Sequence, residues 1–530
     1  MRPEDQKRIL SDLRQRVVEE HLQVDRHDEG GGAGRSLAET LADSVYFETL
    51  RLNSEKPSRS KRKEEMFWRE VREQLSHSDS FRHQQWLGHV VDRYATEICG
   101  NFDERVYQLA TRAVVPTLSL LLNAVSPKRL IWAQGAPANI EDTVIVQGEV
   151  EHLRRLNEIG TVILAPTHIS NLDSIILGHA IYRMGLPPFI YGAGLNLFSN
   201  PLISFFMNHL GAYTVDRKKV DPIYKQTLKT YASLTLEYGY NNLFFPGGTR
   251  SRSGALERHL KLGLLGTSVE AYVNALRRGS RRPRIFIVPA TLSSQLVLEA
   301  ETLIDDFLKD VGKARYIITD DEFSRSKRVL DFANQLVGLD SRIYVTVGRG
   351  FDPMGNSVDD EGESLDPRGR HVDPMRYTLV RGQPAILPQR DSEYTREVGE
   401  RLKEAYMRDH VIQSTHVAAF AVLNLLRLKY RRLDLLRLLR THSSEPELAL
   451  LEVYREVERL LDVLRAENGR GKVRLSAGLL RTTADEVIQD ALRIFACYHS
   501  RAAMQRIADR LTIHDRQLLF YYHNRLVDTR

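Results

Sequence analysis

The chain has only two cysteines among its 530 residues, Cys99 and Cys497, and they lie far apart in the sequence. Two distant cysteines argue against a disulfide framework and against a cysteine-based metal site, so we expect a reducing, cytoplasmic compartment. The first residues are charged and lead into a polar segment without an apolar h-region. We therefore expect no secretory signal.

A long hydrophobic run is also lacking. The longest apolar stretch covers residues 113–126, contains Pro116, and is shorter than the roughly 20 residues that cross a bilayer. We expect any membrane contact to be peripheral, at the cytoplasmic face. Helix-turn-helix, RNP and zinc-finger motifs are missing too, which makes nucleic acid the weaker choice of anionic partner.

The composition that is present, 42% hydrophobic and 27% charged residues, is ordinary for a soluble globular protein of two or three domains. The net charge of +6 is a modest basic excess. Its basic clusters fall at residues 58–63, 277–284 and 427–440. Solvated helix faces and contact with an anionic surface are equally weighted interpretations of these clusters.

The spacing of apolar residues divides the chain into four parts. Residues 1–140 have helical spacing, and their glycine-rich stretch at 30–36 lacks the lysine of a phosphate loop and is predicted to be a flexible linker. In residues 141–355, short β-rich runs alternate with helical segments, which predicts an α/β domain with a mixed, largely parallel sheet. Residues 356–390 are predicted to be a loop or linker, and residues 391–530 a helical domain.

Particular elements follow from local signals. Helices are expected to begin at Asn200 with Pro201 and at Asp221 with Pro222, because each pair is an N-cap before a first-turn proline. Residues 411–440 combine an apolar block with arginines, which favours a pair of core helices over a membrane-surface helix. The expected strands are residues 144–146, 162–165, 189–191, 213–215, 243–245, 285–288 and 343–347.

His168 and Asp173 follow one of these strands, where a helix is expected to begin. Proteins with α/β sheets place ligands and chemistry at such strand ends. Histidine side chains titrate near neutrality, which suits a general base. On one regular helix the two side chains would point roughly 140° apart. They can meet only if the strand-to-helix turn lies between them, and Asp173 can then orient the imidazole.

A structural alternative exists for Asp173. Ser170 precedes it by three residues, the spacing of a capping box, so Ser170 and Asn171 would begin the helix and line the pocket. The same His-x4-Asp spacing recurs at His523, in a helical tail with no apolar strand before it. The His-x4-Asp spacing alone is therefore weak evidence for a catalytic pair. No Gly-x-Ser-x-Gly motif is present, which disfavours an esterase and predicts that the base activates a substrate hydroxyl directly.

A glycine-rich and arginine-rich segment follows another expected strand. Gly248 lets the backbone approach an anion closely, Thr249 can donate a hydrogen bond, and Arg250 and Arg252 carry forked donors that match phosphate. The alternative is a basic surface turn. Elsewhere, Pro289 is expected to stop an apolar strand that shapes a pocket wall.

Four blocks of the chain resemble, in order and approximate spacing, the glycerophospholipid acyltransferase family. The resemblance covers roughly residues 141–350 and rests on His168 to Asp173, Gly211 to Arg217, Phe245 to Gly254, and Val288 with Pro289. It implies that His168 is the general base and that Asp173 orients it. It further implies that Arg250 binds the acceptor's phosphate, with Arg217 and Lys261 as weaker candidates on the phosphate side.

The activity implied by the resemblance is transfer of a fatty acyl group from a thioester of coenzyme A or acyl carrier protein to the hydroxyl of glycerol 3-phosphate. Lysophosphatidate and dihydroxyacetone phosphate are the alternative acceptors. No cofactor or metal is expected, because a thioester is already activated. One departure is Gly247, where the family usually has glutamate. Either a neighbour such as Asp216 substitutes, or acceptor preference or activity differs, and a non-catalytic lipid-binding protein is the remaining alternative.

Overall fold

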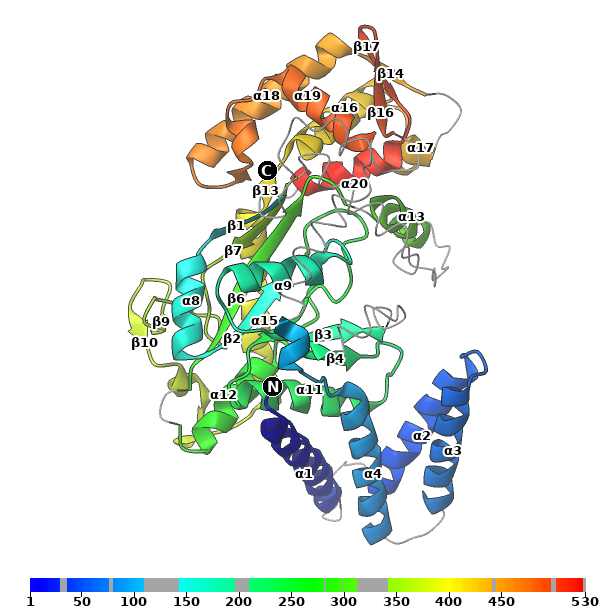
Figure 1. The fold of residues 1–530 in the computed structure, drawn as a ribbon, viewed down its shortest axis with the longest axis vertical. Coiled ribbons are helices and arrows are strands. Elements are labelled where there is room, and N and C mark those ends of the chain that lie inside the picture. The colour runs from blue at the N-terminus through cyan, green and yellow to red at the C-terminus, as the bar shows by residue number, and fades with distance from the viewer. Residues whose placement is uncertain are drawn as a thin grey trace.

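The computed structural model describes residues 1–28, 36–75, 80–108, 143–195, 209–280, 283–297, 299–311, 342–440, 445–496 and 502–527. An α/β sheet lies in the middle of the molecule, with amino-terminal helices at one end and carboxyl-terminal helices at the other (Figure 1). The predicted fold class, a mixed and largely parallel sheet with helical regions on both sides, is confirmed.

The amino-terminal helices form their own hydrophobic cluster, to which Tyr213 and Tyr231 of the α/β region also contribute. The predicted glycine-rich linker falls outside the described residues except for Ser36, which caps the second helix in a capping box with Glu39. The described part of this region is helical as predicted, with α1 (Pro3–Asp28), α2 (Leu37–Asn53), α3 (Arg59–Leu75) and α4 (Ser80–Ile98).

The central sheet has seven strands in the order β1-β7-β6-β2-β5-β3-β4. Every neighbouring pair is parallel except β6 with β7. All seven predicted strand segments are confirmed, with shifts of a few residues at their ends. The strands are β1 (Val144–Gly148), β2 (Thr161–Pro166), β3 (Ile190–Gly194), β4 (Ala212–Val215), β5 (Asn242–Leu243), β6 (Ile285–Ser294) and β7 (Ile343–Val347).

Pro289 does not stop its strand, so that prediction is wrong. β6 continues to Ser294, because after Pro289 it pairs with β7 as well as with β2. A proline lacks only its own N–H donor, and the carbonyl of Pro289 still accepts a hydrogen bond of 2.9 Å from the Gly348 amide. The loss of one donor beside the end of β7 is tolerated.

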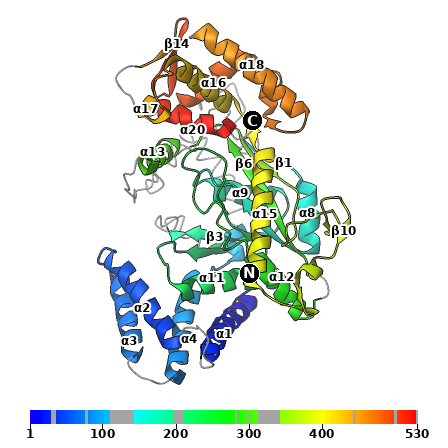
Figure 2. The ribbon, with the colours of Figure 1, turned by 180° about the vertical axis from the view of Figure 1, so that it is seen from behind.

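Alternating residues of β2 contribute to two hydrophobic clusters, as the period of a strand requires. Val162 and Leu164 belong to the cluster that includes α8 and α9, whereas Ile163 and Ala165 belong to the cluster that includes α12 and α15. Figure 2 shows α15 running along the sheet on the side opposite to α9. The flanking helices are α8 (Val150–Ile159), α9 (Asp173–Arg183), α11 (Pro222–Glu237), α12 (Thr267–Arg277), α13 (Ala300–Val311) and α15 (Pro388–Asp409).

The two predicted helix starts have different outcomes. Asp221 is the N-cap of α11, with Pro222 in the first turn, and its side chain accepts a hydrogen bond from the Ile223 amide at 2.9 Å. The start predicted at Asn200 lies outside the described residues. α15 packs on the sheet, where the Tyr406 hydroxyl donates to the carbonyl of Ala165 at 2.9 Å.

The segment predicted as a loop has only short elements, namely β8 (Ser357–Val358), β9 (Ser364–Leu365), β10 (His371–Val372), a 3-10 turn (Pro374–Thr378), β11 (Leu379–Val380) and β12 (Gln383–Pro384). The carboxyl-terminal region is mainly helical but also has a small sheet in the order β14-β17-β16. Its elements are β13 (Val411–Ile412), α16 (Ser414–Lys429), α17 (Leu435–Arg440), β14 (Glu447–Ala449), α18 (Leu450–Gly469), β15 (Arg474–Leu475), a 3-10 turn (Ala477–Leu480), α19 (Ala484–Phe495), β16 (Met504–Ile507), β17 (Arg510–Ile513) and α20 (Arg516–Val527).

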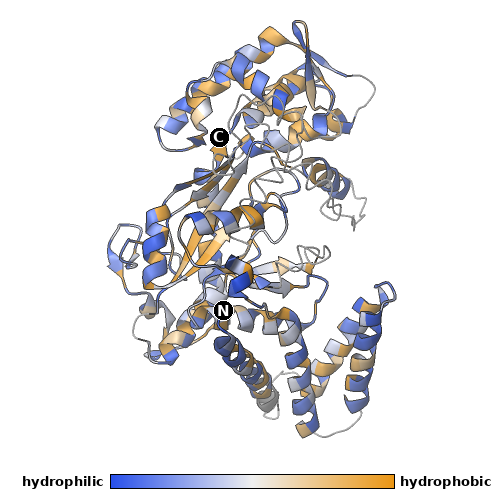
Figure 3. Cartoon of the chain, viewed as in Figure 1, coloured by the Kyte–Doolittle hydropathy of each residue, from blue (hydrophilic) through white to orange (hydrophobic). Residues whose placement is uncertain are grey.

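α16 is a core helix, as predicted for the apolar block within residues 411–440. Residues 414–423 of this helix are all buried, and it packs against α18, α19 and α20. Figure 3 shows hydrophobic residues concentrated in the central strands, while α3 at the edge of the molecule is largely hydrophilic. Among the described helices, none combines the length and apolar character of a segment that crosses a bilayer.

Candidate active site

The predicted site residues follow strands whose carboxyl ends lie at one edge of the sheet. β2, β6, β5, β3 and β4 are mutually parallel, so the segments that follow them leave the sheet on the same side. The loop of His168 follows β2, the loop of Arg217 follows β4, and the glycine-rich loop follows β5. The topology thus brings three separate predicted blocks to one edge.

His168 and Asp173 meet as the sequence predicted. His168 Nδ1 lies 2.8 Å from Asp173 Oδ2, and the same oxygen accepts hydrogen bonds from the amides of Ile169 at 2.6 Å and Ser170 at 2.9 Å. The Asp173 side chain is buried and the His168 side chain is 15% exposed. Asp173 therefore fixes both the imidazole and the backbone that carries it.

The prediction that Ser170 and Asn171 begin the helix is wrong, because α9 begins at Asp173 and its N-cap is Leu172. Ser170 and Asn171 are buried in the loop instead. The Ser170 hydroxyl donates to Glu299 Oε2 and the Asn171 amide donates to Glu299 Oε1, both at 2.9 Å. Glu299, a buried carboxylate in the segment after β6, thus accepts the hydrogen bonds of the Ser170 hydroxyl and the Asn171 amide.

A third carboxyl group supports the backbone of His168. The His168 amide donates to Glu257 Oε1 at 2.6 Å, so four consecutive amides, those of residues 168–171, are bonded to Glu257, Asp173 and Glu299. The Ser251 amide donates to the carbonyl of His168 at 2.9 Å. Because both the amide and the carbonyl of His168 are hydrogen-bonded, the backbone from which its ring projects is held in place.

The imidazole of His168 also has a fixed plane. It stacks on the ring of Phe245 with a centroid distance of 4.1 Å and an angle of 22° between the planes. Its Nδ1 is bonded to Asp173, whereas Nε2 has no hydrogen-bond partner among the described residues. The ring therefore presents one nitrogen for chemistry.

The glycine-rich loop after β5 has the backbone that the sequence suggests. Gly248 has a φ of +71°, and a Cβ there would lie 2.5 Å from the Cδ of Lys261, so a larger residue would be strained and would displace that lysine. Lys261 is exposed, and its amide donates to the carbonyl of Pro246 at 2.6 Å. Thr249, the residue after Gly248, is exposed. Pro289 is buried in β6, opposite Ala165 of β2.

The predicted phosphate-binding arginines have different surroundings. Arg250 Nη1 lies 3.2 Å from Glu299 Oε1, and its side chain is 18% exposed. Arg252 is exposed and forms an ion pair with Asp310 of α13. Burial lowers the pKa of the Arg217 guanidinium, and repulsion from Arg250 lowers it further. The positive charges of Arg217 and Arg250 thus repel each other.

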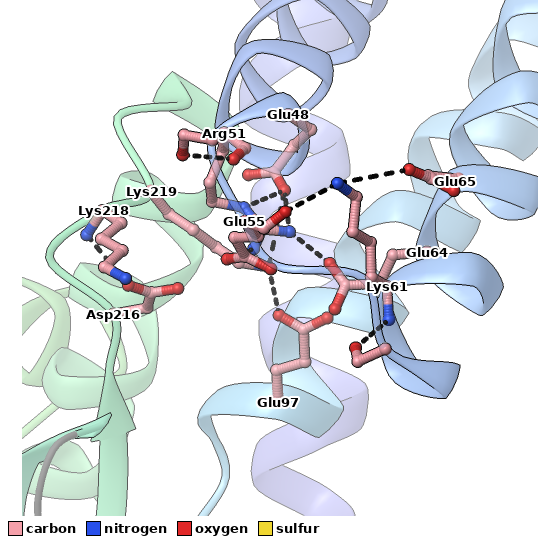
Figure 4. A network of polar contacts seen from close by, with 12 residues as sticks. Glu48, Arg51, Glu55, Lys61, Glu64, Glu65, Glu97, Asp216, Lys218 and Lys219 are labelled. Carbon is pink, nitrogen blue, oxygen red and sulfur yellow. Dashed lines mark hydrogen bonds and ion pairs between the residues drawn. The ribbon is translucent and has the colours of Figure 1, made fainter.

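The amino-terminal helices hold the loop that carries Arg217. Lys219 of this loop pairs with Glu97 of α4 and lies 3.8 Å from Glu48 of α2 (Figure 4). The Lys219 ammonium lies over the ring of Tyr94, 4.8 Å from its centroid. Asp221 accepts hydrogen bonds from the Ser44 hydroxyl at 2.9 Å and from the Tyr94 hydroxyl. The helical region therefore helps to position the site.

The carboxyl-terminal helix α20 packs on the glycine-rich loop. Asn524 Nδ2 donates to the carbonyl of Ser253 at 2.8 Å, and a Cβ at Gly254 would lie 2.0 Å from the carbonyl oxygen of Tyr521. His523, the second histidine with the same spacing, is buried and stacks on Phe420 at 4.7 Å. The expectation that no apolar strand precedes it is wrong, because β17 (Arg510–Ile513) comes directly before α20. His523 nevertheless lies within the helix and not at a strand end, and its helix is part of the core.

Sequence reasoning missed Glu257, Glu299 and Arg525. A Cβ at Gly247 would lie 2.9 Å from Glu257 Oε1, so Glu257 lies where a side chain at 247 would point. Asp216, the substitute suggested from the sequence, instead accepts a hydrogen bond from the Lys218 amide at 2.9 Å. Arg525 of α20 is 3% exposed and lowers the pKa of Glu257 against the larger effect of burial. No local motif marks any of the three.

Comparison with known proteins agrees with this geometry. Residues 147–293 match the family model described as Acyltransferase. They extend from the end of β1 into β6 and include the loops that carry His168, Arg217 and Arg250. This segment is an acyltransferase domain. It is similar to the glycerophospholipid acyltransferase family that the four blocks resemble.

The relatives of the acyltransferase domain are named glycerol-3-phosphate acyltransferase. The protein from Pseudomonas aeruginosa is 28% identical over 176 residues, which is 32% of this chain and 20% of the relative. The one from Pseudomonas fluorescens is 30% identical over 176 residues with the same coverage. The one from Aeromonas hydrophila is 34% identical over 154 residues, 29% of this chain and 18% of the relative. The chain matches about one fifth of the length of these curated relatives.

Proposed function

We propose that the chain transfers a fatty acyl group from an acyl thioester to the hydroxyl of glycerol 3-phosphate, with His168 as the general base. The observation that carries this proposal is the contact of 2.8 Å between His168 Nδ1 and Asp173 Oδ2 at the strand end of an acyltransferase domain. The printed name of the relatives supports glycerol 3-phosphate over lysophosphatidate and dihydroxyacetone phosphate as acceptor.

The base acts through Nε2. A carboxylate can only accept hydrogen bonds, so the pairing with Asp173 keeps the proton on Nδ1 and leaves the lone pair on Nε2. Nε2 takes the proton of the acceptor hydroxyl as its oxygen attacks the thioester carbonyl carbon. The carbon–sulfur bond then breaks, and the imidazolium returns its proton to the leaving thiolate. Asp173 stabilises the imidazolium between these steps.

Arg250 and Arg217 are the groups that we expect to bind the acceptor's phosphate. Arg250 pairs with Glu299 through Nη1, and a guanidinium carries five N–H donors in a fork that matches phosphate. Arg217 adds a second positive charge close to it. Lys261, Thr249 and Arg252 line the same glycine-rich loop as weaker candidates. No cofactor is needed in this scheme, because the thioester supplies the activated acyl group.

The donor and the location of the protein are further parts of the proposal. Coenzyme A and acyl carrier protein are both anionic, as is a phospholipid surface, and the chain carries a net charge of +6. We propose a thioester of either carrier as donor and peripheral association with the cytoplasmic face of a membrane, in the reducing compartment that two distant cysteines suit.

The decisive experiment measures thiol release by the purified chain from acyl-coenzyme A, and in parallel from acyl carrier protein thioester. Release should depend on glycerol 3-phosphate and should fall by about 10²–10⁴-fold in His168→Ala, the usual contribution of a positioned base. His371→Ala is the matched control, because this histidine is exposed in the segment between β9 and the 3-10 turn. Equal activity in both variants would contradict the mechanism.

A panel of acceptors completes the test. Glycerol 3-phosphate, dihydroxyacetone phosphate and lysophosphatidate are compared at equal concentration, with water alone as the fourth arm. Faster release with lysophosphatidate would replace the proposed acceptor, and release that is equal with water alone would indicate a thioesterase. Absence of release in every arm by folded wild-type protein would favour a non-catalytic lipid-binding role.

A further inference from the structure

The third block of this chain lacks the glutamate of its family but has a carboxyl group in the place where that side chain would point. Gly247 follows β5 by a few residues, and a Cβ built on it would lie 2.9 Å from Oε1 and 3.1 Å from Cδ and Cγ of Glu257. The Glu257 side chain, ten residues further along the chain, thus occupies the space next to Gly247 into which a side chain at 247 would point. A side chain at 247 would therefore require the side chain of Glu257 to shift from its present position.

The Glu257 carboxyl group makes a contact that matters for the base. Its Oε1 accepts the amide hydrogen of His168 at 2.6 Å, and its Oε2 is buried without a hydrogen-bond partner among the described residues. The other amides of this loop, at Ile169, Ser170 and Asn171, are bonded to Asp173 and Glu299. Glu257 is therefore the group that fixes the residue whose imidazole does the chemistry.

Opposite charge lies close to this carboxyl group. Arg525 of α20 is 3% exposed, has one guanidinium nitrogen without a hydrogen-bond partner, and acts electrostatically on Glu257. A buried arginine with incomplete bonding is costly unless negative charge is near. The positive charge of Arg525 thus favours ionisation of Glu257, although burial outweighs this effect and raises the pKa of the carboxyl group to about 8.

We propose that Glu257 is a positioning residue that takes over, from the opposite side of the loop, the carboxyl contact that a glutamate at position 247 would make with the amide of His168. This inference rests on the proposed function of His168. It explains how the chain can keep His168 in place although its third block has glycine at 247. It also means that a side chain at 247 would have to displace that of Glu257, which lies in front of Gly247.

The test is an exchange of the two positions. Glu257→Ala removes the bond that fixes the His168 amide and should lower kcat by roughly 5- to 150-fold, because the base is then held less well in its reactive position. Gly247→Glu alone should be at least as impaired, because its side chain meets Glu257. The double variant Gly247→Glu with Glu257→Ala should regain kcat to within about 10-fold of wild type. A purely structural role for Glu257 would not give this reversal.

A conservative variant covers the case in which the exchanged protein does not fold. Glu257→Gln keeps an oxygen that accepts from His168 and should retain kcat within about 5-fold, whereas Glu257→Leu, of similar size, should behave like Glu257→Ala. All variants should keep the KM for glycerol 3-phosphate within about 3-fold, because the hydrogen bond of Glu257 in the described structure is to the amide of His168 and not to Arg217 or Arg250. Each variant is first checked by thermal melting.

The outcomes separate this inference from the function on which it rests. If His168→Ala abolishes acyl transfer but the double variant folds and stays as low as Glu257→Ala, the role of Glu257 is wrong and the mechanism stands. Glu257→Gln as inactive as Glu257→Leu would also overturn it. If His168→Ala remains active, the proposed mechanism itself fails.

Discussion

Arg250 and Glu299 form an ion pair in which Nη1 and Oε1 lie 3.2 Å apart and the carboxylate is completely buried. The same carboxylate accepts hydrogen bonds from Ser170 and Asn171, in the loop of the base. The arginine expected to bind phosphate and the loop that carries His168 are therefore joined through one side chain. In the proposed mechanism, this shared carboxylate would couple binding of the acceptor to positioning of His168.

Replacement of Arg250 should test phosphate binding. Arg250→Lys keeps the charge but loses the forked donors, so KM for glycerol 3-phosphate should rise by about 10- to 100-fold while KM for the acyl thioester changes little. Arg252→Lys is the matched control, because it is exposed and paired with Asp310, and exposed ion pairs contribute little. Steady-state kinetics with each substrate varied in turn decide the matter. An equal rise of KM in both variants would refute the assignment to Arg250.

Asp173→Asn should lower kcat without unfolding the protein. The amide side chain is close in size, but it can present an N–H to His168 and so favour the wrong tautomer, as in other histidine–aspartate pairs where the loss is about 10⁴-fold. A loss of roughly 10²–10⁴-fold in kcat is expected, with KM for glycerol 3-phosphate nearly unchanged. Near-wild-type kcat in this variant would mean that Asp173 serves only to bond the amides of Ile169 and Ser170.

Stability should depend on pH through a buried carboxyl group. Burial raises the pKa of Glu257 to about 8, whereas a glutamate in an unfolded chain titrates near about 4.3. Between these values the folded protein keeps a proton that the unfolded chain has released. The free energy of unfolding should therefore fall as pH rises from about 5 to 8, with a slope approaching about 1.4 kcal/mol per pH unit for one proton.

Glu257→Gln removes this titration and should flatten the slope, as measured by urea denaturation at several pH values. Glu467→Gln is the control, because hydrogen bonding to Lys472 lowers the pKa of this exposed carboxylate and keeps its titration below the window. Burial also raises the pKa of Glu270, to about 7, so a smaller slope of the same sign should persist. Identical slopes for wild type and Glu257→Gln would show that Glu257 is not buried in solution.

The sequence predicted those parts of the site that local patterns mark. An apolar run before His168 identified a strand end, and the glycines and arginines after residue 245 identified a second. Asp221 with Pro222 gave a helix start because capping depends on neighbours in the chain. The prediction that Pro289 ends its strand was wrong, because whether a proline ends a strand depends on which partner strand lies beside its nitrogen.

The supporting carboxyl groups could not be predicted in this way. Glu257 and Glu299 lie 89 and 128 residues from the loop amides with which they bond, and nothing in their own neighbourhoods distinguishes them from surface glutamates. Ser170 was assigned to a helix cap because its spacing to Asp173 fits one. The competing partner, Glu299, becomes visible only when β2 and β6 are placed side by side.

The contact between α20 and the glycine-rich loop should be measurable with two glycines. Gly254 and Gly239 both have a φ of +80°, but a Cβ at Gly254 would lie 2.0 Å from the carbonyl oxygen of Tyr521, whereas a Cβ at Gly239 would have no heavy atom within 4 Å. Alanine at either position should cost about 1–2 kcal/mol through backbone strain. Gly254→Ala should cost about 1–3 kcal/mol more, as overpacking does, and should lower kcat because α20 must move away from the loop. Urea denaturation and steady-state kinetics of the two variants give the comparison, and equal losses of stability would mean that α20 does not pack on this loop in solution.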